Sequence, residues 1–361
     1  MRVFQNIGLY AAYVAQIEHL WQGLPTFSAK IQALVDDRFG GVHYLKPVIE
    51  RDPSLFFVAG DSVSLQKLWS KEMGMRSDAS LEEILLAQIE HHRTDIFYNL
   101  DPVRYDNKFL TRIPGCVKKT IAWRAAPSGN ANFLNHDLIV NNYPHLSAQY
   151  RAMGAKTAYF HPGHDPAMDQ FGGNSERPID VLFIGGYSRH HLERASTLEA
   201  VSRLAHRHKV VFNLDVSRAT QLAETPLGWF GPLTKLRRPK SIRQITHAPV
   251  FGLDMYRQIS RAKIVINGKV DIAGPDRGNM RVWEALGCGA MLITDPGRYP
   301  DKMAPNTDFV IAGNTLEISD KIEKLLECHI QRQEITRAGS KMIREKFSKS
   351  VQWKLFQELC S

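Results

Sequence analysis

Cysteines and long apolar runs are scarce in this chain of 361 residues. Its four cysteines have no CxxC spacing and no neighbouring cluster of histidines, which favours reduced, structural thiols of a cytosolic protein over a disulfide scaffold. No run of about 18 apolar residues occurs, so we expect no membrane-spanning helix. Residues 1–8 carry one charge and a short, broken apolar stretch, which predicts a first strand and loop rather than a signal peptide.

Common phosphate and metal motifs are absent as well. Without GxxxxGKS/T a P-loop kinase or ATPase is disfavoured, and without GxGxxG after a predicted strand so is a dinucleotide-dependent oxidoreductase. His161 and His164 lie beside Asp165, but they lack the glutamate of an HExxH metal site and fall in a Pro- and Gly-rich hinge. We therefore expect no metal there, and we place His164 on the lining of an interdomain cleft.

The chain does have an excess of positive charge, and its position is informative. Lysine and arginine number 46 against 37 aspartates and glutamates, a formal net charge of +9. Between Arg177 and Lys269 there are 16 basic and 6 acidic residues, so this segment alone holds an excess of ten. Its densest basic run, Lys235–Arg243, is usually a solvated loop, but it could contact an anionic acceptor or a membrane surface. Because Pro239 interrupts the run and no aromatic residues adjoin it, we expect no nucleic-acid partner.

The hydrophobic pattern predicts an α/β fold. Ser80 and Glu83 form a capping box before a helix over Leu81–His92, and helices of this kind alternate with short apolar runs. This alternation implies βαβ units in two mostly parallel sheets, because it restarts after a hinge near residues 161–176. The expected strands are Val3–Ile7, Leu55–Ala59, Ile96–Asn99, Lys119–Trp123, Leu138–Val140, Thr157–Phe160, Asp180–Gly186, Lys209–Asn213, Lys263–Asn267, Met291–Thr294 and Phe309–Ala312.

Residues 252–297 carry the most chemistry, and they predict helix, strand, polar loop, helix and strand. The loop Gly274–Asn279 precedes a helix that begins near Met280, so backbone N–H groups and the positive end of the helix dipole converge there. Arg281 could add a charge-assisted bond to a phosphate at this point. Glu284, one turn further on, is within reach of a ribose diol attached to that phosphate. The passage therefore predicts a nucleotide site.

The pattern Asn279-x-Arg281-x-x-Glu284-Ala285-x-Gly287-x-Gly289 resembles the C-terminal domain of GT-B glycosyltransferases. More closely, it is similar to the CgeB-like, spore-maturation-protein branch of the group 1 transferases, over about residues 177–347. The resemblance implies two Rossmann-like domains that face each other across a cleft. Their implied ranges are 1–172 for the acceptor, 173–345 for the donor and 346–361 for a C-terminal helix returning to the first domain.

The same resemblance implies roles for individual residues. Glu284 would bind the ribose of a nucleotide-sugar donor, and Asp276, eight positions earlier, occupies the place of a glutamate near the donor sugar. The diphosphate would be held by arginines and by the start of the helix. The donor-binding residues implied in this way are Gly185, Gly186, Arg194, Asn267, Gly278, Asn279, Arg281 and Glu284. No Asp-x-Asp pair occurs, so the metal site of GT-A transferases is absent and we expect neither a metal nor another cofactor.

The acceptor side is less informative. Polar residues that follow the expected strands would face the cleft, namely Asn6, Asp61, Asn99, Asp101 and Arg124. If the enzyme inverts configuration, an acid must take the proton of the acceptor hydroxyl, and Asp61 and Asp101 are the candidates. If it retains configuration, no protein base is required, and Asp276 with the donor phosphate matters more.

Together these patterns predict a metal-independent glycosyltransferase of hexosyltransferase type that acts in glycan or glycoconjugate biosynthesis. It would transfer a sugar to a hydroxyl of a carbohydrate, lipid-linked or protein acceptor, in the cytoplasm or peripherally at the inner face of a membrane. One alternative is a nucleotide-sugar epimerase on the same fold, which would consume the donor without an acceptor. Another is a non-enzymatic polyanion-binding protein, whose binding would depend steeply on salt.

Overall fold

The computed structural model describes residues 1–130, 132–187, 192–229, 231–268 and 273–361. The chain divides into two compact units. The first contains Met1–Gly163, Ile272–Asp276 and Lys349–Ser361, and the second contains His164–Asp271 and Arg277–Ser348. The main borders thus lie at 163/164 and 348/349, compared with 172/173 and 345/346 in the sequence-based division.

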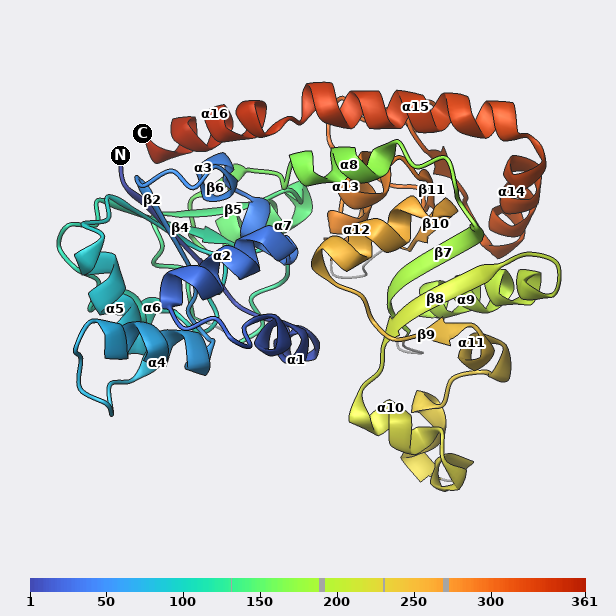
Figure 1. Ribbon diagram of the computed structural model, residues 1–361. Coiled ribbons are helices and arrows are strands. Elements are labelled where there is room, and N and C mark those ends of the chain that lie inside the picture. Colours follow the sequence, from blue (N-terminus) through green and yellow to red (C-terminus); the bar gives the residue numbers. More distant parts are fainter. Residues whose placement is uncertain (131, 188–191, 230, 269–272) are drawn as a thin grey trace. The chain divides into compact units, whose positions relative to one another are not determined.

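The first unit is built on a six-stranded parallel sheet in the order β2-β1-β3-β4-β5-β6 (Figure 1). Every residue of β1 and β3 is buried, as expected for parallel strands covered by helices on both faces. The predicted strands are confirmed, β5 being one residue longer and β6 one residue shorter than expected. The strands are β1 (Val3–Ile7), β2 (Leu55–Ala59), β3 (Ile96–Asn99), β4 (Lys119–Trp123), β5 (Leu138–Asn141) and β6 (Thr157–Tyr159).

Helices connect and cover these strands. The capping box is present as predicted, because Ser80 Oγ accepts from Glu83 N and the Glu83 carboxylate accepts from Ser80 N. The helices of this unit are α1 (Ala11–Leu20), α2 (Phe27–Asp37), η1 (Gly40–His43), α3 (Lys46–Ile49), α4 (Val63–Glu72), α5 (Leu81–His91), α6 (Asn107–Leu110), α7 (Pro144–Ala152) and α16 (Lys349–Cys360).

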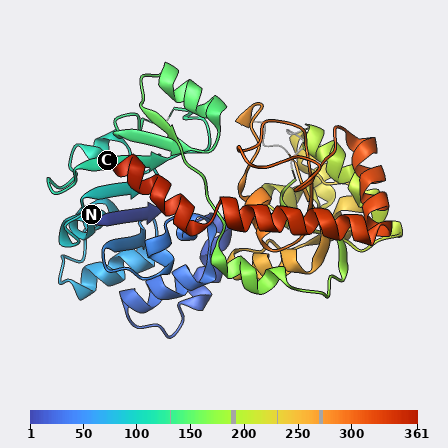
Figure 2. The same cartoon turned by 90° about the horizontal axis from the view of Figure 1, so that it is seen from above.

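The last helix, α16, packs on the first sheet although it is almost 200 residues away in sequence from the nearest strand (Figure 2). Phe356 is fully buried, with its ring centroid 4.9 Å from that of Tyr98 on β3 and 5.5 Å from that of Phe160. Lys349, also buried, donates from Nζ to Pro162 O at 2.7 Å. Residues Lys349–Ser361 therefore belong to the first unit.

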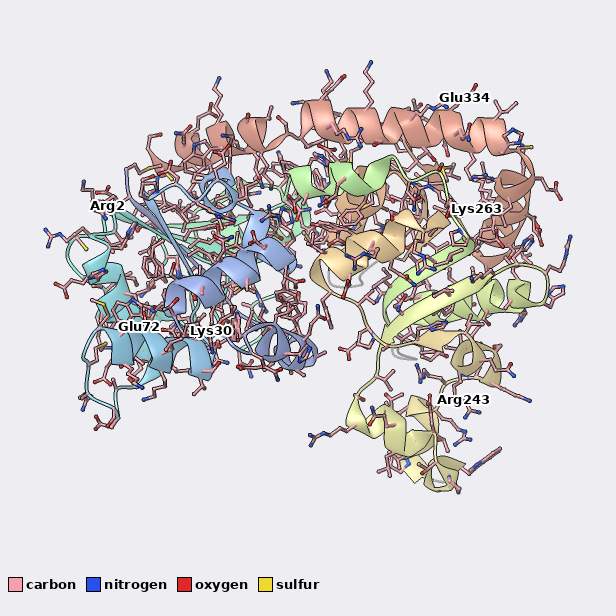
Figure 3. The ribbon with its side chains drawn as sticks, in the orientation of Figure 1. Arg2, Lys30, Glu72, Arg243, Lys263 and Glu334 are labelled. Carbon is pink, nitrogen blue, oxygen red and sulfur yellow. The ribbon has the colours of Figure 1, made fainter. Side chains whose placement is uncertain are left out.

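The second unit has a six-stranded parallel sheet in the order β12-β11-β10-β7-β8-β9. The central strands β7 and β10 are also joined by an ion pair of 2.6 Å between Asp180 and Lys263, the latter labelled in Figure 3. The predicted strands are again present: β11 has the expected bounds, the other four differ at one or both ends, and the short β9 was not predicted. The strands are β7 (Ile179–Gly186), β8 (Val210–Asp215), β9 (Thr246–His247), β10 (Ala262–Asn267), β11 (Met291–Thr294) and β12 (Val310–Ile311).

Two helical layers enclose this sheet. On one face Trp283 is fully buried, and its ring stacks edge-on against Phe347 with centroids 4.8 Å apart. No helix among the described residues is long and apolar enough to cross a membrane. The helices are η2 (Pro166–Met168), α8 (Asp169–Gly172), α9 (Leu192–Arg203), η3 (Leu204–His206), α10 (Arg218–Ala223), η4 (Pro226–Trp229), η5 (Gly231–Leu236), α11 (Lys240–Gln244), α12 (Gly252–Ser260), α13 (Met280–Gly287), α14 (Thr315–Glu327) and α15 (His329–Lys346).

The docking of α16 can be tested by shortening its buried anchor. We expect Phe356→Ala to lower the free energy of unfolding by about 3–5 kcal/mol, because it leaves a cavity among aromatic rings. Val351→Ala, at a position of the same helix that is 41% exposed, is the matched control and should change stability by less than about 0.5 kcal/mol. Denaturant unfolding measures both, and equal losses in the two variants would contradict the packing described.

Candidate nucleotide and acceptor sites

The second sheet reverses its direction of growth between β7 and β10. From β7 the chain adds β8 and β9 on one side, and β10, β11 and β12 lie on the other. In open α/β sheets, ligands bind outside the carboxyl ends of the strands at such a switch point. Gly185 and Gly186 end β7 and Asn267 ends β10, and the parallel pairing of Val265 with Leu182 brings these ends to one edge.

A pair of amide side chains ties this edge to the start of α13. Asn267 Nδ2 donates to Asn279 Oδ1 at 3.1 Å, and Asn279 Nδ2 donates back to Asn267 Oδ1 at 3.0 Å. Asn279 is the N-cap residue of α13, but its side chain bonds to Asn267 instead of capping its own helix. The pair therefore holds the N-terminus of α13 against the carboxyl end of β10, where the helix dipole attracts an anion.

Gly278 and Arg194 complete the edge. Gly278 has φ +117°, a conformation that other residues rarely adopt, and its carbonyl accepts from the buried Trp283 Nε1 at 3.1 Å. Arg194 on α9 donates from Nη2 to Gly268 O at 3.4 Å, directly after β10. The structure thus gathers Gly185, Gly186, Arg194, Asn267, Gly278 and Asn279 at one edge of the second sheet.

Arg281 and Glu284 have a different environment from the one expected of ligand-facing side chains. Their side chains are 15% and 4% exposed, and Arg281 Nη1 lies 2.6 Å from Glu284 Oε2. Burial raises the pKa of Glu284, and the Arg281 guanidinium opposes that rise only in part. In this structure the two side chains are engaged with each other along the buried side of α13.

Asp276 belongs to the first unit, although the donor residues around it in sequence belong to the second. It is 1% exposed, and its Oδ2 accepts from the backbone N–H of His145 at 2.6 Å, in the first turn of α7. The neighbouring Ala273 packs in the core beneath that helix. This carboxylate stabilises the positive end of α7, so the observed contact is structural.

His164 lies in the second unit and is 4% exposed. Its Nε2 lies 3.0 Å from Asp169 Oδ1, and Arg344 Nε lies 2.7 Å from the same oxygen. Burial lowers the pKa of His164, so the neutral ring is favoured despite the nearby carboxylate. A Cβ added at Gly287 would come within 3.1 Å of His164 Nδ1, which places this ring beside the end of α13.

The first sheet has its own switch point, between β1 and β3. Here Asn6 Nδ2 donates to Asn99 Oδ1 at 3.1 Å, and Asn6 Oδ1 accepts from Gly60 N at 2.9 Å. Tyr105 and His136 complete the network. Tyr105 Oη donates to Gly60 O at 2.6 Å, and His136 Nε2 lies 3.3 Å from Asn99 Nδ2. The sequence analysis did not identify Tyr105 or His136, because neither follows a strand at the carboxyl edge.

Asp61 and Asp101 lie at the same edge. Burial raises the pKa of Asp61, and the charge of Asp101 raises it further, while the backbone N–H of Leu9 donates to Asp61 Oδ2 at 2.9 Å and opposes the rise. Burial also raises the pKa of Asp101, which Arg104 counteracts from 3.2 Å and Arg124 from further away. Among the described residues, Asp61 Oδ1 has no hydrogen-bond partner.

A hollow of about 390 Å³ lies beside Asp61. Leu9, Val14 and Val63 contribute an apolar wall, and Glu18, Ser62 and Ser64 contribute polar atoms. It lies where β1 and β2 lead into α1 and α4, so it belongs to the carboxyl edge of the first sheet. This hollow can take a molecule that has an apolar part and a hydroxyl group.

Two arginines of the basic run Lys235–Arg243 bond to residues of the segment between β8 and β9, in which the run itself lies. Arg238 is 7% exposed and forms a two-bond pair with Glu224, at 2.5 and 3.0 Å. Arg237 donates from Nη1 to two backbone carbonyl oxygens near the end of α10, both at 2.8 Å. These two arginines stabilise the segment between β8 and β9, which reduces the charge left to meet a membrane or an anionic acceptor. The side chain of Lys235 lies outside the described residues.

No group of three or more His, Cys, Asp or Glu side chains in the described part of the chain is placed to hold a metal ion. The cysteines that were expected to be reduced are all free thiols in the structure.

Comparisons with known proteins bear on the fold and on the second unit. Residues 194–356 match a sequence family described as glycosyl transferase-like. Alr3699/HepE from Anabaena in complex with UDP is 10% identical, covers 99% of both chains and has a TM-score of 0.57. A glycosyltransferase from Rickettsia africae is 14% identical, with 99% of this chain and 97% of that chain covered and a TM-score of 0.56. Sucrose-phosphate synthase from Thermosynechococcus elongatus is 10% identical, with 99% of this chain and 98% of that chain covered and a TM-score of 0.54. None of the curated protein sequences compared with this chain matches it.

The fold is that of GT-B glycosyltransferases, as predicted. The family match lies within the region, about residues 177–347, that carries the sequence resemblance, except for its last residues. The chain therefore has two parallel α/β units with the GT-B fold, and residues 194–356, which lie mostly in the second unit and in α16, match the glycosyl transferase-like family.

The buried pair of Arg281 and Glu284 yields a stability prediction. We expect Arg281→Met to lower the free energy of unfolding at neutral pH by about 3 kcal/mol, because it leaves a buried carboxylate without its partner. This loss should shrink as the pH falls, because the raised pKa of Glu284 lets the folded protein take up a proton before the unfolded chain does.

The double variant Arg281→Met with Glu284→Gln is the control for this pair, because it removes both charges. Its free energy of unfolding should depend on pH less than that of the single variant over the same range, because no carboxylate remains at position 284 to take up a proton. A loss in the single variant that is constant from neutral to acidic pH would contradict the pairing.

Proposed function

We propose that this protein transfers a sugar from a uridine-diphosphate sugar to a hydroxyl of an acceptor, as a member of the CgeB-like branch of group 1 transferases. The observation that carries the proposal is the carboxyl edge of the second sheet, where Arg194 and the start of α13 converge on the switch point. Support for uridine comes from structural neighbours, since HepE is described in complex with UDP and with UDP-glucose. The acceptor is a carbohydrate, a lipid-linked molecule or a protein.

In this mechanism the second unit stabilises the leaving diphosphate. The N-terminus of α13 supplies backbone dipoles, and Arg194 supplies a charge-assisted hydrogen bond. Negative charge on the leaving group grows as the glycosidic bond breaks, so these groups bind the transition state more tightly than the bound donor. Glu284 reaches a ribose in this proposal only if its contact with Arg281 rearranges, and Asp276 contacts the donor sugar only if its bond to His145 is exchanged.

The first unit would bind the acceptor. We propose Asp61 as the base that takes the proton of the acceptor hydroxyl, which requires that the reaction inverts configuration. Two observations support Asp61 over Asp101: its Oδ1 has no hydrogen-bond partner among the described residues, and it borders the hollow beside α1. Asp101 is paired with Arg104 instead, and it would tune the pKa of Asp61 through its charge.

Calorimetry with UDP tests the donor site. We expect UDP to bind, and we expect Arg194→Gln to weaken that binding about tenfold or more, which is the usual contribution of a hydrogen bond between charged groups. Arg203→Gln is the matched control, because Arg203 lies exposed in the last turn of the same helix and should leave the affinity unchanged. Equal affinity in the wild type and in Arg194→Gln would contradict this site.

Two further measurements bear on the reaction. We propose that no divalent metal is required, so UDP affinity and turnover should be the same with magnesium and with EDTA.

Product analysis with UDP-glucose alone separates transfer from epimerisation, because an epimerase converts the donor when no acceptor is present. Conversion of UDP-glucose to an epimer without an acceptor would replace the proposed activity.

The pH dependence of kcat/KM tests the role of Asp61. Asp61→Asn should reduce kcat by a factor of about 10² to 10⁴, the usual contribution of a general base. Asp101→Asn should keep activity but move the acidic limb of the profile to lower pH, because removing the neighbouring charge lowers the pKa of Asp61. If Asp101→Asn abolishes activity and Asp61→Asn does not, the roles are reversed. If neither variant loses activity, no base acts from this edge.

A further inference from the structure

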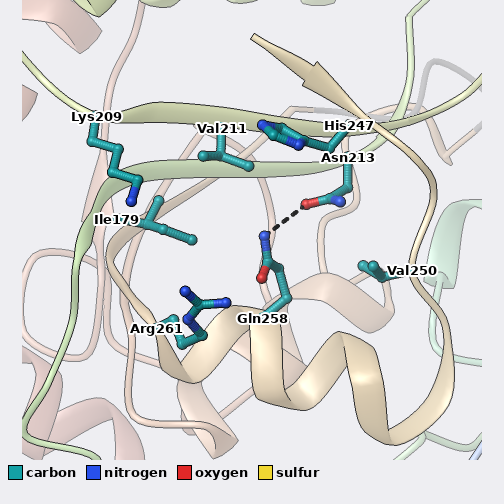
Figure 4. A pocket seen from close by; sticks show the side chains of 8 residues that line it. All are labelled: Ile179, Lys209, Val211, Asn213, His247, Val250, Gln258 and Arg261. Atoms are coloured by element: carbon teal, nitrogen blue, oxygen red, sulfur yellow. Dashed lines mark hydrogen bonds between the residues drawn. The ribbon is translucent and has the colours of Figure 1, made fainter.

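A second hollow lies on a face of the second sheet, and none of the expected donor residues lines it. It has a volume of about 320 Å³ and is bounded by the beginnings of β7 and β8 and by the C-terminal half of α12 (Figure 4). Alternate residues of β8 point in opposite directions, so Phe212 and Leu214 pack in the core of the other face while Val211 and Asn213 face this hollow.

Its interior combines apolar carbon with a buried amide pair. Ile179 and Val211 are 2% and 6% exposed and form the floor. Gln258 Nε2 donates to Asn213 Oδ1 at 3.2 Å across the middle, as the dashed line in Figure 4 shows. Asn213 Nδ2 donates to Ala248 O at 2.7 Å, which fixes the orientation of its amide. Amide groups held in this way can exchange hydrogen bonds with hydroxyl groups of a ligand.

Its rim is cationic. Lys209, from the residue before β8, and Arg261, from the end of α12, approach from opposite walls with Ile179 between them (Figure 4). Among the described residues neither has a carboxylate within ion-pair distance. The nearby Asp180 accepts from the backbone N–H of Lys209 at 2.8 Å, and its other oxygen pairs with Lys263. His247 borders the opposite end of the hollow.

We propose that this hollow is a second ligand site, for a small phosphorylated molecule of about the size of a sugar phosphate. Lys209 and Arg261 would bind the phosphate, since a guanidinium forms two parallel bonds to such a group and an ammonium adds charge. The amide pair of Asn213 and Gln258 would meet hydroxyl groups, and the apolar floor would contact the body of the ligand. A volume of about 320 Å³ lies at the lower end of the usual range for small-molecule pockets.

This proposal does not rest on the proposed transfer reaction. The hollow extends from Ile179 and Lys209, at the amino ends of β7 and β8, to His247 at the end of β9, whereas the proposed donor residues lie at the carboxyl ends of β7 and β10. Neither Arg194 nor Asn279 lines the hollow, so a ligand there would not occupy their positions. Binding there would link a phosphorylated metabolite to the second unit as a regulator.

Methyl NMR resolves the two sites, because the hollow contains its own reporters. Glucose 6-phosphate is titrated into the full chain labelled at isoleucine and valine methyl groups. The signals of Ile179, Val211 and Val250 should shift and saturate, whereas Ile266 and Ile293, which lie near the donor edge, should follow a separate curve or not move. Glucose, which lacks the phosphate group, should produce no saturating shift. Inorganic phosphate should compete with glucose 6-phosphate.

The double variant Lys209→Gln with Arg261→Gln should weaken this binding about tenfold or more, because it removes the charge-assisted bonds. Arg218→Gln with Lys240→Gln removes the same charge from exposed positions elsewhere in the unit and is the matched control. Thermal unfolding verifies that both variants are folded. The proposal would be overturned if the methyl signals of Ile179, Val211 and Val250 did not shift, or if the two double variants bound glucose 6-phosphate with equal affinity. An unchanged UDP affinity in both double variants would show that the donor site is intact.

Discussion

The two hydrogen bonds between Asn267 and Asn279 hold the start of α13 against the end of β10, the place where we propose that the donor diphosphate binds. Parallel strands place their carboxyl ends at one edge, but a helix that follows such a strand can begin at many positions. The amide pair fixes the start of α13 against the end of β10, and the left-handed conformation of Gly278 turns the chain into that position. Arg194 then completes the edge from α9. The first unit repeats the principle with Asn6 and Asn99, two further amides at a switch point.

Charge has three different uses in the second unit. Arg237 and Arg238 stabilise the segment between β8 and β9, so part of the basic excess is structural. Arg194 donates to Gly268 O at the carboxyl edge of the second sheet, where we propose that the donor binds. Lys209 and Arg261 remain at the rim of a separate hollow. The net charge of a segment therefore says little about its ligand until each guanidinium and ammonium has been assigned a partner.

The alternation of strands and helices could be predicted from sequence, because buried parallel strands such as Val3–Ile7 are continuous apolar runs between polar loops. The sequence also allowed us to predict that Gly185, Asn267 and Asn279 lie at one edge, because a parallel topology brings the carboxyl ends of strands together. The pairing of Arg281 with Glu284 did not follow, because a helical spacing of three allows a side chain to face either its neighbour or a ligand. Nor did the contact of Asp276 with His145, which joins positions 131 residues apart.

A crystal structure of the protein with UDP would test the central claim most directly, because it locates the diphosphate relative to both sheets. The account predicts phosphate oxygens at the start of α13, within hydrogen-bond distance of Arg194, while the pair of Asn267 and Asn279 remains intact. A diphosphate bound elsewhere, with the carboxyl edge of the second sheet empty, would contradict it.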